Sequence, residues 1–314
     1  MRSVGLVGAR GYVGGELVRL LAGHPGLALA RAASRQGVGA TLREQIGAGP
    51  EGLVVEDMSP ETVAGWGVDV VVLALPNGLA ASYAAALAGG PAIVDLSADY
   101  RFDDGWVYGL PELHRARIAG ARRIANPGCY ATGIQLGIAP ARELLHGVPQ
   151  AFGVSGYSGA GTSPSPRNDP ERLRDNLMAY SLTGHVHERE ASRHLGCAVR
   201  FMPHVASFFR GISLTITLPL ARAETAASLL ARYCEAYAGE PLVRVVAEIP
   251  EVKAAAGRHG VTIGGFAVDG THAVLVVTLD NLLKGAATQA LQNINLALGL
   301  SERLGVPDDQ AAVG

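Results

Sequence analysis

The sequence predicts an α/β protein of two domains, the first built from parallel βαβ units and the second around a mostly antiparallel sheet. Three observations support this fold class. An apolar strand enters a glycine-rich turn at the start, apolar runs alternate with helical patterns up to about residue 130, and apolar and polar residues alternate strictly after about residue 148. A chain of 314 residues with 48% hydrophobic residues can bury two cores.

The first part of the chain reads as strands and helices in turn. After a first strand and a glycine turn, apolar residues such as Val13 and Leu17 recur at helical spacing. The later runs are apolar throughout, which is typical of parallel strands covered on both faces. The expected elements are strands at 4–7, 27–32, 69–76, 92–97 and 122–126, a helix ended by Gly23 and Pro25, and an alanine-rich helix at 78–90.

The second part has the pattern of a sheet with one buried face. In residues 211–220, Ile212, Leu214 and Ile216 alternate with hydroxyl residues, as expected for a strand that is covered on one side. We expect further strands at 242–249, 261–268 and 272–279, a helix at 223–238 with Cys234 on its apolar side, and a long amphipathic closing helix at 285–305.

Composition and charge exclude several classes of protein. The formal net charge of -2 and the lack of a Lys/Arg run argue against nucleic acid as a partner. No apolar run is long enough to span a bilayer, and the first residues read as a strand and not as a signal peptide. Three cysteines without a Cys-x-x-Cys pair suit a reducing compartment. We therefore expect a soluble cytoplasmic protein.

Glycines 8, 11 and 14 follow the first strand and open the first helix. Small residues at this spacing let the backbone approach a pyrophosphate, whose charge is held by free N–H groups and by the positive end of the helix. The position predicts a Rossmann-type dinucleotide-binding domain, and the alternative is a tight connection without a ligand. After the second strand stand Ser34 and Arg35, where NAD-binding folds usually carry an acid. They favour NADP(H), unless Arg35 is only a solvated loop residue.

Cys129 stands in "NPGCY", directly before a helical pattern, so its thiol is expected at the positive end of that helix. Such a position favours the thiolate, lowers the pKa of the thiol and makes it a nucleophile. The alternative is a packed core residue, which we expect for Cys197 and Cys234.

His185 and His187 are candidate proton donors or acceptors for a reaction at Cys129. Two residues apart in an extended backbone, they would share one face. The alternatives are a surface pair or a zinc site that also uses His194 and Cys197. We expect no metal, because no Cys-x-x-Cys pair supports the cluster.

Several polar groups could bind anionic parts of a ligand. The loop at 155–166 offers backbone N–H groups and hydroxyls, although it could be only flexible. Asp280, Asn281 and Lys284 stand between the last strand and the closing helix, where they could alternatively cap that helix. Arg101 and Arg210 are candidate clamps for a carboxylate or phosphate, and an exposed arginine without a ligand is the other reading of each.

Taken in order, these stretches resemble one family. The motifs "GARGYVGGELVRLL", "LALPNG", "VDLSADYRF", "NPGCYAT", "SGYSGAG", "HVHERE" and "DNLLKGAATQA" are similar to those of the N-acetyl-gamma-glutamyl-phosphate reductases of arginine biosynthesis, from residue 3 to about 300. Where that family often has "HRHxPEI", this chain has "HVHEREA". The combination of "NPGCYAT" and "DNLLKGAATQA" is not a general feature of dinucleotide-binding folds.

The resemblance implies NADPH-dependent reduction of N-acetyl-L-glutamyl 5-phosphate to the 5-semialdehyde through a thioester on the cysteine. It also implies a catalytic and dimerisation domain like that of glyceraldehyde-3-phosphate dehydrogenase, at 131–280. A nucleotide domain at 1–130 would be rejoined by a C-terminal helix within 281–314. The expected assembly is a homodimer or homotetramer, and the expected partner is a small acyl phosphate.

The expected site residues fall into three groups. The catalytic residues are Cys129, His185 and His187, and the substrate-binding residues are Arg101, Asn126 and Arg210. The expected contacts of the cofactor are Gly8, Arg10, Gly11, Tyr12, Val13, Gly14, Ser34, Arg35, Pro76, Asn77, Ser158, Gly159, Asn281 and Lys284. Two other functions remain open: a reductase of an aminoadipyl or aspartyl phosphate, and a noncatalytic NADPH-sensing module.

Overall fold

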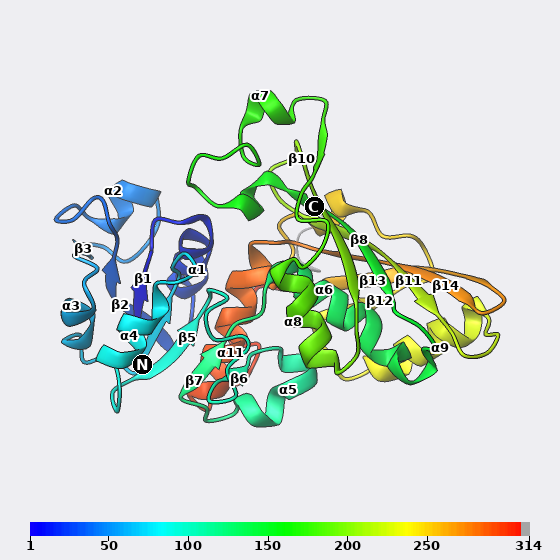
Figure 1. Cartoon of the computed structure of the whole chain (residues 1–314). Coiled ribbons are helices and arrows are strands. Elements are labelled where there is room, and N and C mark those ends of the chain that lie inside the picture. Colours follow the sequence, from blue (N-terminus) through cyan, green and yellow to red (C-terminus); the bar gives the residue numbers. More distant parts are fainter. Residues whose placement is uncertain (309–314) are drawn as a thin grey trace. The chain divides into compact units, whose positions relative to one another are not determined.

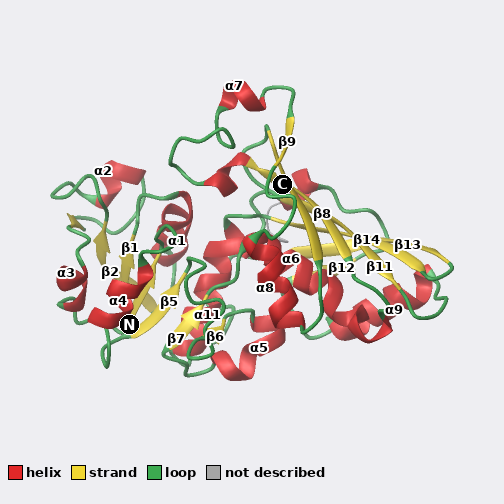
Figure 2. Cartoon of the chain, in the orientation of Figure 1, coloured by secondary structure: helices red, strands yellow, loops and turns green. Residues whose placement is uncertain are grey.

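The computed structural model describes residues 1–308, and it divides into two compact units. One comprises Met1–Gly128 with Ala286–Pro307, and the other comprises Cys129–Gly285. Each unit has one large sheet with helices around it (Figures 1 and 2). Of the expected C-terminal segment 281–314, residues 309–314 lie outside the described part of the chain.

The sheet of the first unit has the strand order β3-β2-β1-β4-β5-β7-β6, and every pair in it is parallel. This confirms the dinucleotide-binding type of fold. The order reverses between β1 and β4, and such a reversal opens a crevice at the carboxyl ends of the strands. The strands are β1 (Arg2–Val7), β2 (Leu27–Ala33), β3 (Val55–Glu56), β4 (Val70–Leu73), β5 (Ala92–Asp95), β6 (Val107–Tyr108) and β7 (Arg123–Ala125).

The helices of this unit are α1 (Tyr12–Ala22), α2 (Leu42–Ile46), α3 (Pro60–Ala64), α4 (Ala80–Ala86), α5 (Pro111–Ile118) and α11 (Thr288–Ala297). The central strands β4 and β5 are buried along their whole length, as their apolar sequences predict. The apolar side of α1, which includes Leu17 and Leu21, packs into a core that also contains residues of β1, β2 and β4. The sheet and α1 therefore form a rigid base for the glycine turn that joins β1 to α1.

The closing helix differs from the expected one. It is short, and its residues from Thr288 to Asn295 are buried all round, so the expectation of a long amphipathic helix is wrong. It contacts α1, α5 and β5. Its polar residues are mainly amides with partners inside the unit. Asn293 donates to Gly109 O, and Asn295 donates to Leu304 O, both through Nδ2. The polar face of α11, which the sequence pattern predicts to be exposed, can therefore be buried because its side chains hydrogen-bond to loops.

The sheet of the second unit has the order β12-β13-β14-β11-β8-β10-β9. It is mostly antiparallel, as expected, and only the pairs β12–β13 and β8–β10 are parallel. Along β11, Ile212, Leu214 and Ile216 are fully buried, which confirms the alternation. The strands are β8 (Gln150–Gly156), β9 (Leu177–Ala179), β10 (Arg200–Ala206), β11 (Ile212–Pro219), β12 (Val243–Val245), β13 (Val261–Asp269) and β14 (His272–Leu279).

Helix α6 (Cys129–Ile138) packs closely against this sheet. A Cβ atom on Gly133 would lie 2.5 Å from Leu214 Cδ1, so the helix approaches β11 only because that residue is glycine. A 3-10 turn (Ala139–Leu144) with Pro140 in its first turn follows. The other helical segments are the 3-10 turn Tyr157–Ala160, α7 (Pro170–Leu173), α8 (Val186–Leu195), α9 (Ala226–Ala236), α10 (Val252–Ala255) and the π-helical turn Leu283–Ala287.

One expectation about α9 is wrong. Cys234 is exposed and not on the apolar side of the helix. The buried residues of α9 are Leu229 and Tyr233, four positions apart on one face, and Cys234 lies one position, about 100°, beyond them. The other cysteine expected in the core, Cys197, is half-buried.

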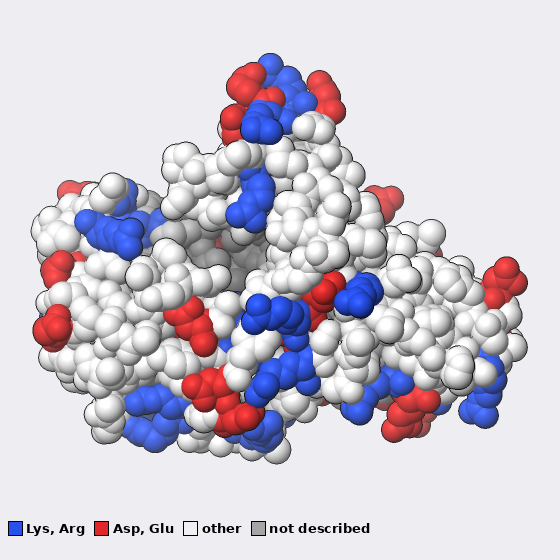
Figure 3. Space-filling model, viewed as in Figure 1, with Lys and Arg blue, Asp and Glu red and all other residues white. Residues whose placement is uncertain are grey.

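On the face drawn in Figure 3, Lys and Arg are mixed with Asp and Glu, and both signs gather around α7. No helix within residues 1–308 has both the length and the apolar character needed to cross a bilayer.

Candidate active site

The glycine turn after β1 is as tight as its sequence predicts. Gly8 has φ +87°, and a Cβ atom there would lie 2.1 Å from Ala74 O. A Cβ atom on Gly14 would lie 2.4 Å from Gly8 O, so only glycine fits at both positions. Gly11 is the N-cap of α1 and has no side chain to occupy the end of the helix. The turn therefore leaves the positive end of α1 open to an anion, as a pyrophosphate requires.

Basic and hydroxyl groups lie beside the end of β2. Arg10 Nη1 donates to Gln36 Oε1 at 3.1 Å, which joins the glycine turn to the loop after β2. Arg10 Nε is buried and has no partner within the described chain. Ser34 is buried at the end of the strand, and Arg35 next to it is exposed. These groups can donate to a phosphate, and no acidic residue stands between 34 and 43 to repel one.

The loop after β4 carries Pro76 and Asn77, and its backbone is fixed. Asn77 Oδ1 accepts from Ala98 N at 2.9 Å, and the Asp99 carboxylate accepts from Gly78 N and Ala80 N. Since β1, β2 and β4 are parallel, the loops that follow them lie at one edge of the sheet. The structure thus gathers the expected cofactor residues of the first unit at the carboxyl edge, near the reversal of strand order.

Arg101 and Asn126 are joined in a buried network. Arg101 Nε donates to Asn126 O at 2.9 Å, and its Nη2 donates to Leu96 O at 2.9 Å. Asn126 Oδ1 accepts from Asn293 of α11. Burial raises the pKa of the neighbouring Asp95 to about 6, although Ser97 and Arg101 act in the opposite direction. The contacts hold Arg101 on the backbone that leads to Cys129, and its role as a substrate clamp stays a prediction.

Cys129 begins α6, as the sequence predicts, and its side chain is half-buried. The turn at 280–285 passes directly against it. A Cβ atom built on Gly285 would lie 2.7 Å from Cys129 Cβ, so this close approach requires glycine. Tyr130 donates from its hydroxyl to His204 O at 2.7 Å, which ties the first turn of α6 to β10. The position of the sulfur is therefore set from two sides.

His185 is the N-cap of α8, and His187 lies in its first turn. The expectation of an extended backbone over these residues is wrong. Their rings are nevertheless close, with centroids 4.8 Å apart, because His185 Nδ1 accepts from His187 N at 3.1 Å and so turns its ring over the helix end. The ring of His187 is 6.1 Å from that of Tyr130. The structure thus brings His187 to Tyr130, the residue that follows Cys129, and His185 lies beside His187.

His185 is neutral near pH 7. Burial, helped by the charge of Arg167, lowers its pKa to about 4, and Glu188 opposes the shift. With Nδ1 accepting from the backbone, the neutral ring carries its proton on Nε2. His185 can therefore donate a hydrogen bond from Nε2 to an oxygen that gains negative charge.

We expect His185 to make the fold sensitive to acid. Its folded pKa, about 4, lies below the unfolded value of 6.5, so its contribution to stability is complete above pH 6.5 and is lost as the pH falls towards 4. In a His185→Asn variant the new residue can still cap α8 but does not titrate. Its Tm should fall less between pH 7 and pH 5 than that of the wild type. A His146→Asn variant, at an exposed histidine, is the control. An equal fall in Tm for the wild type, His185→Asn and His146→Asn would contradict the role of His185 in the acid sensitivity.

The alternative of a zinc site is not supported. His194 lies in the last turn of α8, nine residues from His185, which is about 13 Å along a helix. Within the described part of the chain, no three His, Cys, Asp or Glu side chains are placed to share a metal ion.

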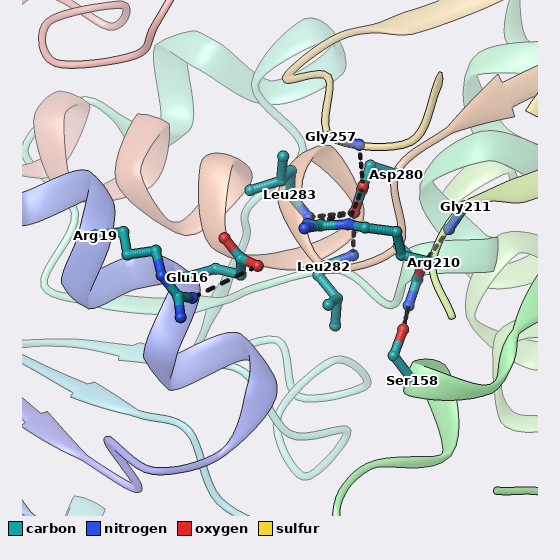
Figure 4. Close-up of polar contacts among 10 residues, drawn as sticks. Glu16, Arg19, Ser158, Arg210, Gly211, Gly257, Asp280, Leu282 and Leu283 are labelled. Atoms are coloured by element: carbon teal, nitrogen blue, oxygen red, sulfur yellow. Dashed lines mark hydrogen bonds and ion pairs between the residues drawn. The ribbon is translucent and has the colours of Figure 1, made fainter. Parts of the chain in front are cut away.

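The groups around Asp280 form a second network (Figure 4). Arg210 Nε donates to Asp280 Oδ2 at 2.6 Å, and its Nη2 donates to Oδ1 at 3.2 Å. Asn281 Nδ2 donates to Ser158 Oγ, and its Oδ1 accepts from Gly211 N. Gly159 is next to Ser158, while Lys284 is fully buried in the turn that leads to Gly285. The structure brings Arg210, Asn281 and Ser158 together, and their contacts with ligands stay predictions.

Two residues at the site were missed from the sequence. The ring centroid of Tyr180 lies 5.6 Å from that of His185. Burial raises the pKa of Tyr180, and the negative charge of a Cys129 thiolate raises it further. Arg167 lies over the ring of Tyr180, with Cζ 4.9 Å from the centroid. Neither position belongs to a helical or strand pattern that would single it out.

Comparison with known proteins identifies the family. Residues 3–121 match the family model described as semialdehyde dehydrogenase, NAD binding domain, and residues 129–281 match the one described as semialdehyde dehydrogenase, dimerisation domain. An N-acetyl-gamma-glutamyl-phosphate reductase of Stenotrophomonas maltophilia is 56% identical over 310 residues, which cover 97% of this chain and 98% of that protein. The chain belongs to the N-acetyl-gamma-glutamyl-phosphate reductase family of semialdehyde dehydrogenases.

Solved structures of other semialdehyde dehydrogenases share the fold. Aspartate semialdehyde dehydrogenase II from Vibrio cholerae has a TM-score of 0.77 at 18% identity, over 95% of this chain and 99% of that one. Aspartate semialdehyde dehydrogenase with NADP from Candida albicans has a TM-score of 0.73 at 17% identity, over 97% and 99% of the two chains. The expected two-domain architecture of the family is therefore confirmed, with a nicotinamide nucleotide domain and a dimerisation domain.

Proposed function

We propose that this enzyme reduces N-acetyl-L-glutamyl 5-phosphate to N-acetyl-L-glutamate 5-semialdehyde with NADPH, releasing phosphate, as a step of arginine biosynthesis. The observation that carries the proposal is a half-buried cysteine at the start of α6, whose neighbour Tyr130 lies 6.1 Å from the ring of His187 in α8, in a chain 56% identical to a reductase of that name.

The nucleotide would be held by the turn that contains Gly8, Gly11 and Gly14 and by the loops after β2 and β4. The open end of α1 and the buried, unpartnered Nε of Arg10 fit a ligand with phosphate groups. When bound, the nicotinamide supplies the hydride for the reduction. The aspartate semialdehyde dehydrogenase of Candida albicans was solved with NADP, which supports the same class of cofactor here.

The chain's own residues would carry out the acyl transfer. Cys129 attacks the acyl carbon, its sulfur forms a thioester, and phosphate leaves with the electron pair of the broken C–O bond. His185 donates a hydrogen bond from Nε2 to the oxyanion that forms at this carbon, before and after reduction. When the reduced adduct collapses, the aldehyde leaves and the Cys129 thiolate is restored. His187, two residues further into α8, would orient His185 through its backbone N–H.

The test is the reverse reaction, in which NADP⁺ and phosphate oxidise N-acetylglutamate semialdehyde. We expect reduction of NADP⁺ that depends on both the semialdehyde and phosphate. Aspartate semialdehyde and aminoadipate semialdehyde serve as competing substrates, since a difference of one methylene changes rates by roughly 10- to 200-fold. Tight NADPH binding without turnover of any of the three would favour a nonenzymatic sensor instead.

We expect the choice between NADPH and NADH to depend on Arg35. In an Arg35→Ser variant, the loss of one charged hydrogen bond to the 2′-phosphate should raise the KM for NADPH by about 10- to 100-fold and leave that for NADH almost unchanged. The measurement is kcat/KM with each cofactor. Arg31→Ser is the matched control, because Arg31 is also exposed on this side but pairs with Glu56. A similar fall in kcat/KM with NADPH and with NADH would argue that Arg35 does not determine the choice of cofactor.

The assembly we propose is a cytoplasmic homodimer or homotetramer. The match of residues 129–281 to a dimerisation domain supports an oligomer that uses the second unit. Sedimentation equilibrium of the full chain gives the number of subunits.

A further inference from the structure

Arg167 is an unassigned cation that lies over Tyr180, whose ring stands against that of His185. Other arginines of the second unit lie within ion-pair distance of acids: Arg174 Nη2 is 2.7 Å from Glu171, Arg200 Nη1 is 3.9 Å from Glu188, and Arg210 Nε is 2.6 Å from Asp280. Arg167 has no carboxylate within 4 Å anywhere in residues 1–308. Its guanidinium lies over the ring of Tyr180 instead. A guanidinium has five N–H donors, so besides the side-chain hydrogen bond between Arg167 and Tyr180 it can still donate to a planar oxyanion.

The loop that carries Arg167 is built to hold its position. Asn168 Oδ1 accepts from Ser165 N at 2.7 Å, and Asn168 Nδ2 donates to Gly161 O and Ser163 O at 2.9 Å and 2.8 Å. These bonds close the loop between residues 161 and 168. Tyr180 is fixed in turn, because its N–H donates to Pro203 O at the edge of the sheet. Both members of the stacked pair therefore have anchored backbones.

The stacked pair faces the reacting groups of the second unit. The ring of Tyr180 is 5.6 Å from that of His185, and it lies close enough to Cys129 for a thiolate there to raise its pKa. Burial is the main cause of the low pKa of His185, and the positive charge of Arg167 lowers it further. Arg167, Tyr180, His185 and Cys129 thus line one site, in which Arg167 is the cation without an acidic partner among the described residues.

We propose that Arg167 binds an oxyanion of the substrate and so is a specificity-determining residue of this site. The inference rests on the proposed function, whose substrate has two such groups, the α-carboxylate and the phosphoryl group. The shared chemistry is a planar or tetrahedral oxyanion that accepts two N–H bonds from a guanidinium.

The first test needs neither substrate nor cofactor. Alkylation of Cys129 by iodoacetate, an anion, is compared with alkylation by neutral iodoacetamide, and each cysteine is followed by peptide mass spectrometry. In Arg167→Ala the ratio of the two rates at Cys129 should fall about three- to tenfold, because a nearby positive charge no longer attracts the anion. Exposed Cys234 is the internal control, and its ratio should not change. An unchanged ratio at Cys129 would overturn the proposal.

The second test identifies the oxyanion by steady-state kinetics of the reverse reaction. Arg167→Ala should raise the KM for phosphate if Arg167 holds the phosphoryl group, or the KM for the semialdehyde if it holds the carboxylate, by about 10- to 100-fold. The KM for NADP⁺ should be unchanged, and Arg167→Lys should restore part of the loss. Arg172→Ala, at an exposed arginine of α7, is the matched control. If Arg167→Ala behaves like Arg172→Ala in an active enzyme, the inference fails. A wild type inactive on every semialdehyde contradicts the proposed function instead.

Discussion

Replacing Cys129 with serine should abolish reduction, with kcat lower by a factor on the order of 10³ or more, because a serine hydroxyl is not ionised near pH 7 and is a much weaker nucleophile than a thiolate. The helix start that favours a thiolate gives a serine hydroxyl far less help, since its pKa is much higher. Mass spectrometry of the wild type, mixed with the acyl phosphate without NADPH, should show an acyl adduct on the peptide that contains Cys129.

Two controls separate this outcome from unfolding. The Cys129→Ser variant should keep the Tm of the wild type and its affinity for NADPH, because the sulfur and oxygen atoms differ little in size. Cys234→Ser, at an exposed position on α9, should retain full activity. Substantial turnover by Cys129→Ser, or an adduct on a different cysteine, would refute the role of Cys129.

The second large effect concerns stability. Asp280→Ala should lower the free energy of unfolding by about 3–5 kcal/mol, because it leaves Arg210 without its buried counterion. The Asp280 side chain has no exposed surface, and besides Arg210 it accepts from Gly257 N at 2.6 Å and from Leu282 N at 2.8 Å. Removing the carboxylate therefore also leaves backbone donors unsatisfied.

Thermal unfolding gives the measurement, and the Tm should fall by several degrees. Asp269→Ala is the control, since Asp269 is an exposed acid at the end of β13. The Asp280→Asn variant retains one acceptor oxygen, so its Tm should lie between those of Asp280→Ala and Asp269→Ala. If Asp280→Ala and Asp269→Ala unfold at the same temperature, the network of Figure 4 contributes little to stability.

Local signals in the sequence were enough for the fold and for part of the site. The glycine turn was predictable because tight turns and helix starts depend on neighbouring residues, and β11 was predictable because a half-buried strand has a period of two. The position of Cys129 at the start of α6 followed from the Pro and Gly before it. Each of these features is determined within about ten residues of chain.

What the sequence did not show depends on contacts between distant segments. His185 caps α8, but histidine is not among the usual capping residues, so the helix start was missed. The position of Arg167 depends on a loop closed by Asn168 and on the ring of Tyr180. Cys234 was misplaced by a single step around the helix, and α11 is buried because partners elsewhere in the fold satisfy its amides.

The proposed use of both ring nitrogens of His185 limits which residues could replace it. One nitrogen secures the first turn of α8 as a lone-pair acceptor, so only the opposite nitrogen is available to a reacting oxygen, and the imidazole cannot flip without releasing the helix. An asparagine side chain could still accept from His187 N and cap the helix, and a protonated carboxylic acid could still donate to an oxyanion. Neither side chain could do both from the positions of the two ring nitrogens. The same imidazole ring would therefore both cap α8 and take part in the proposed reaction.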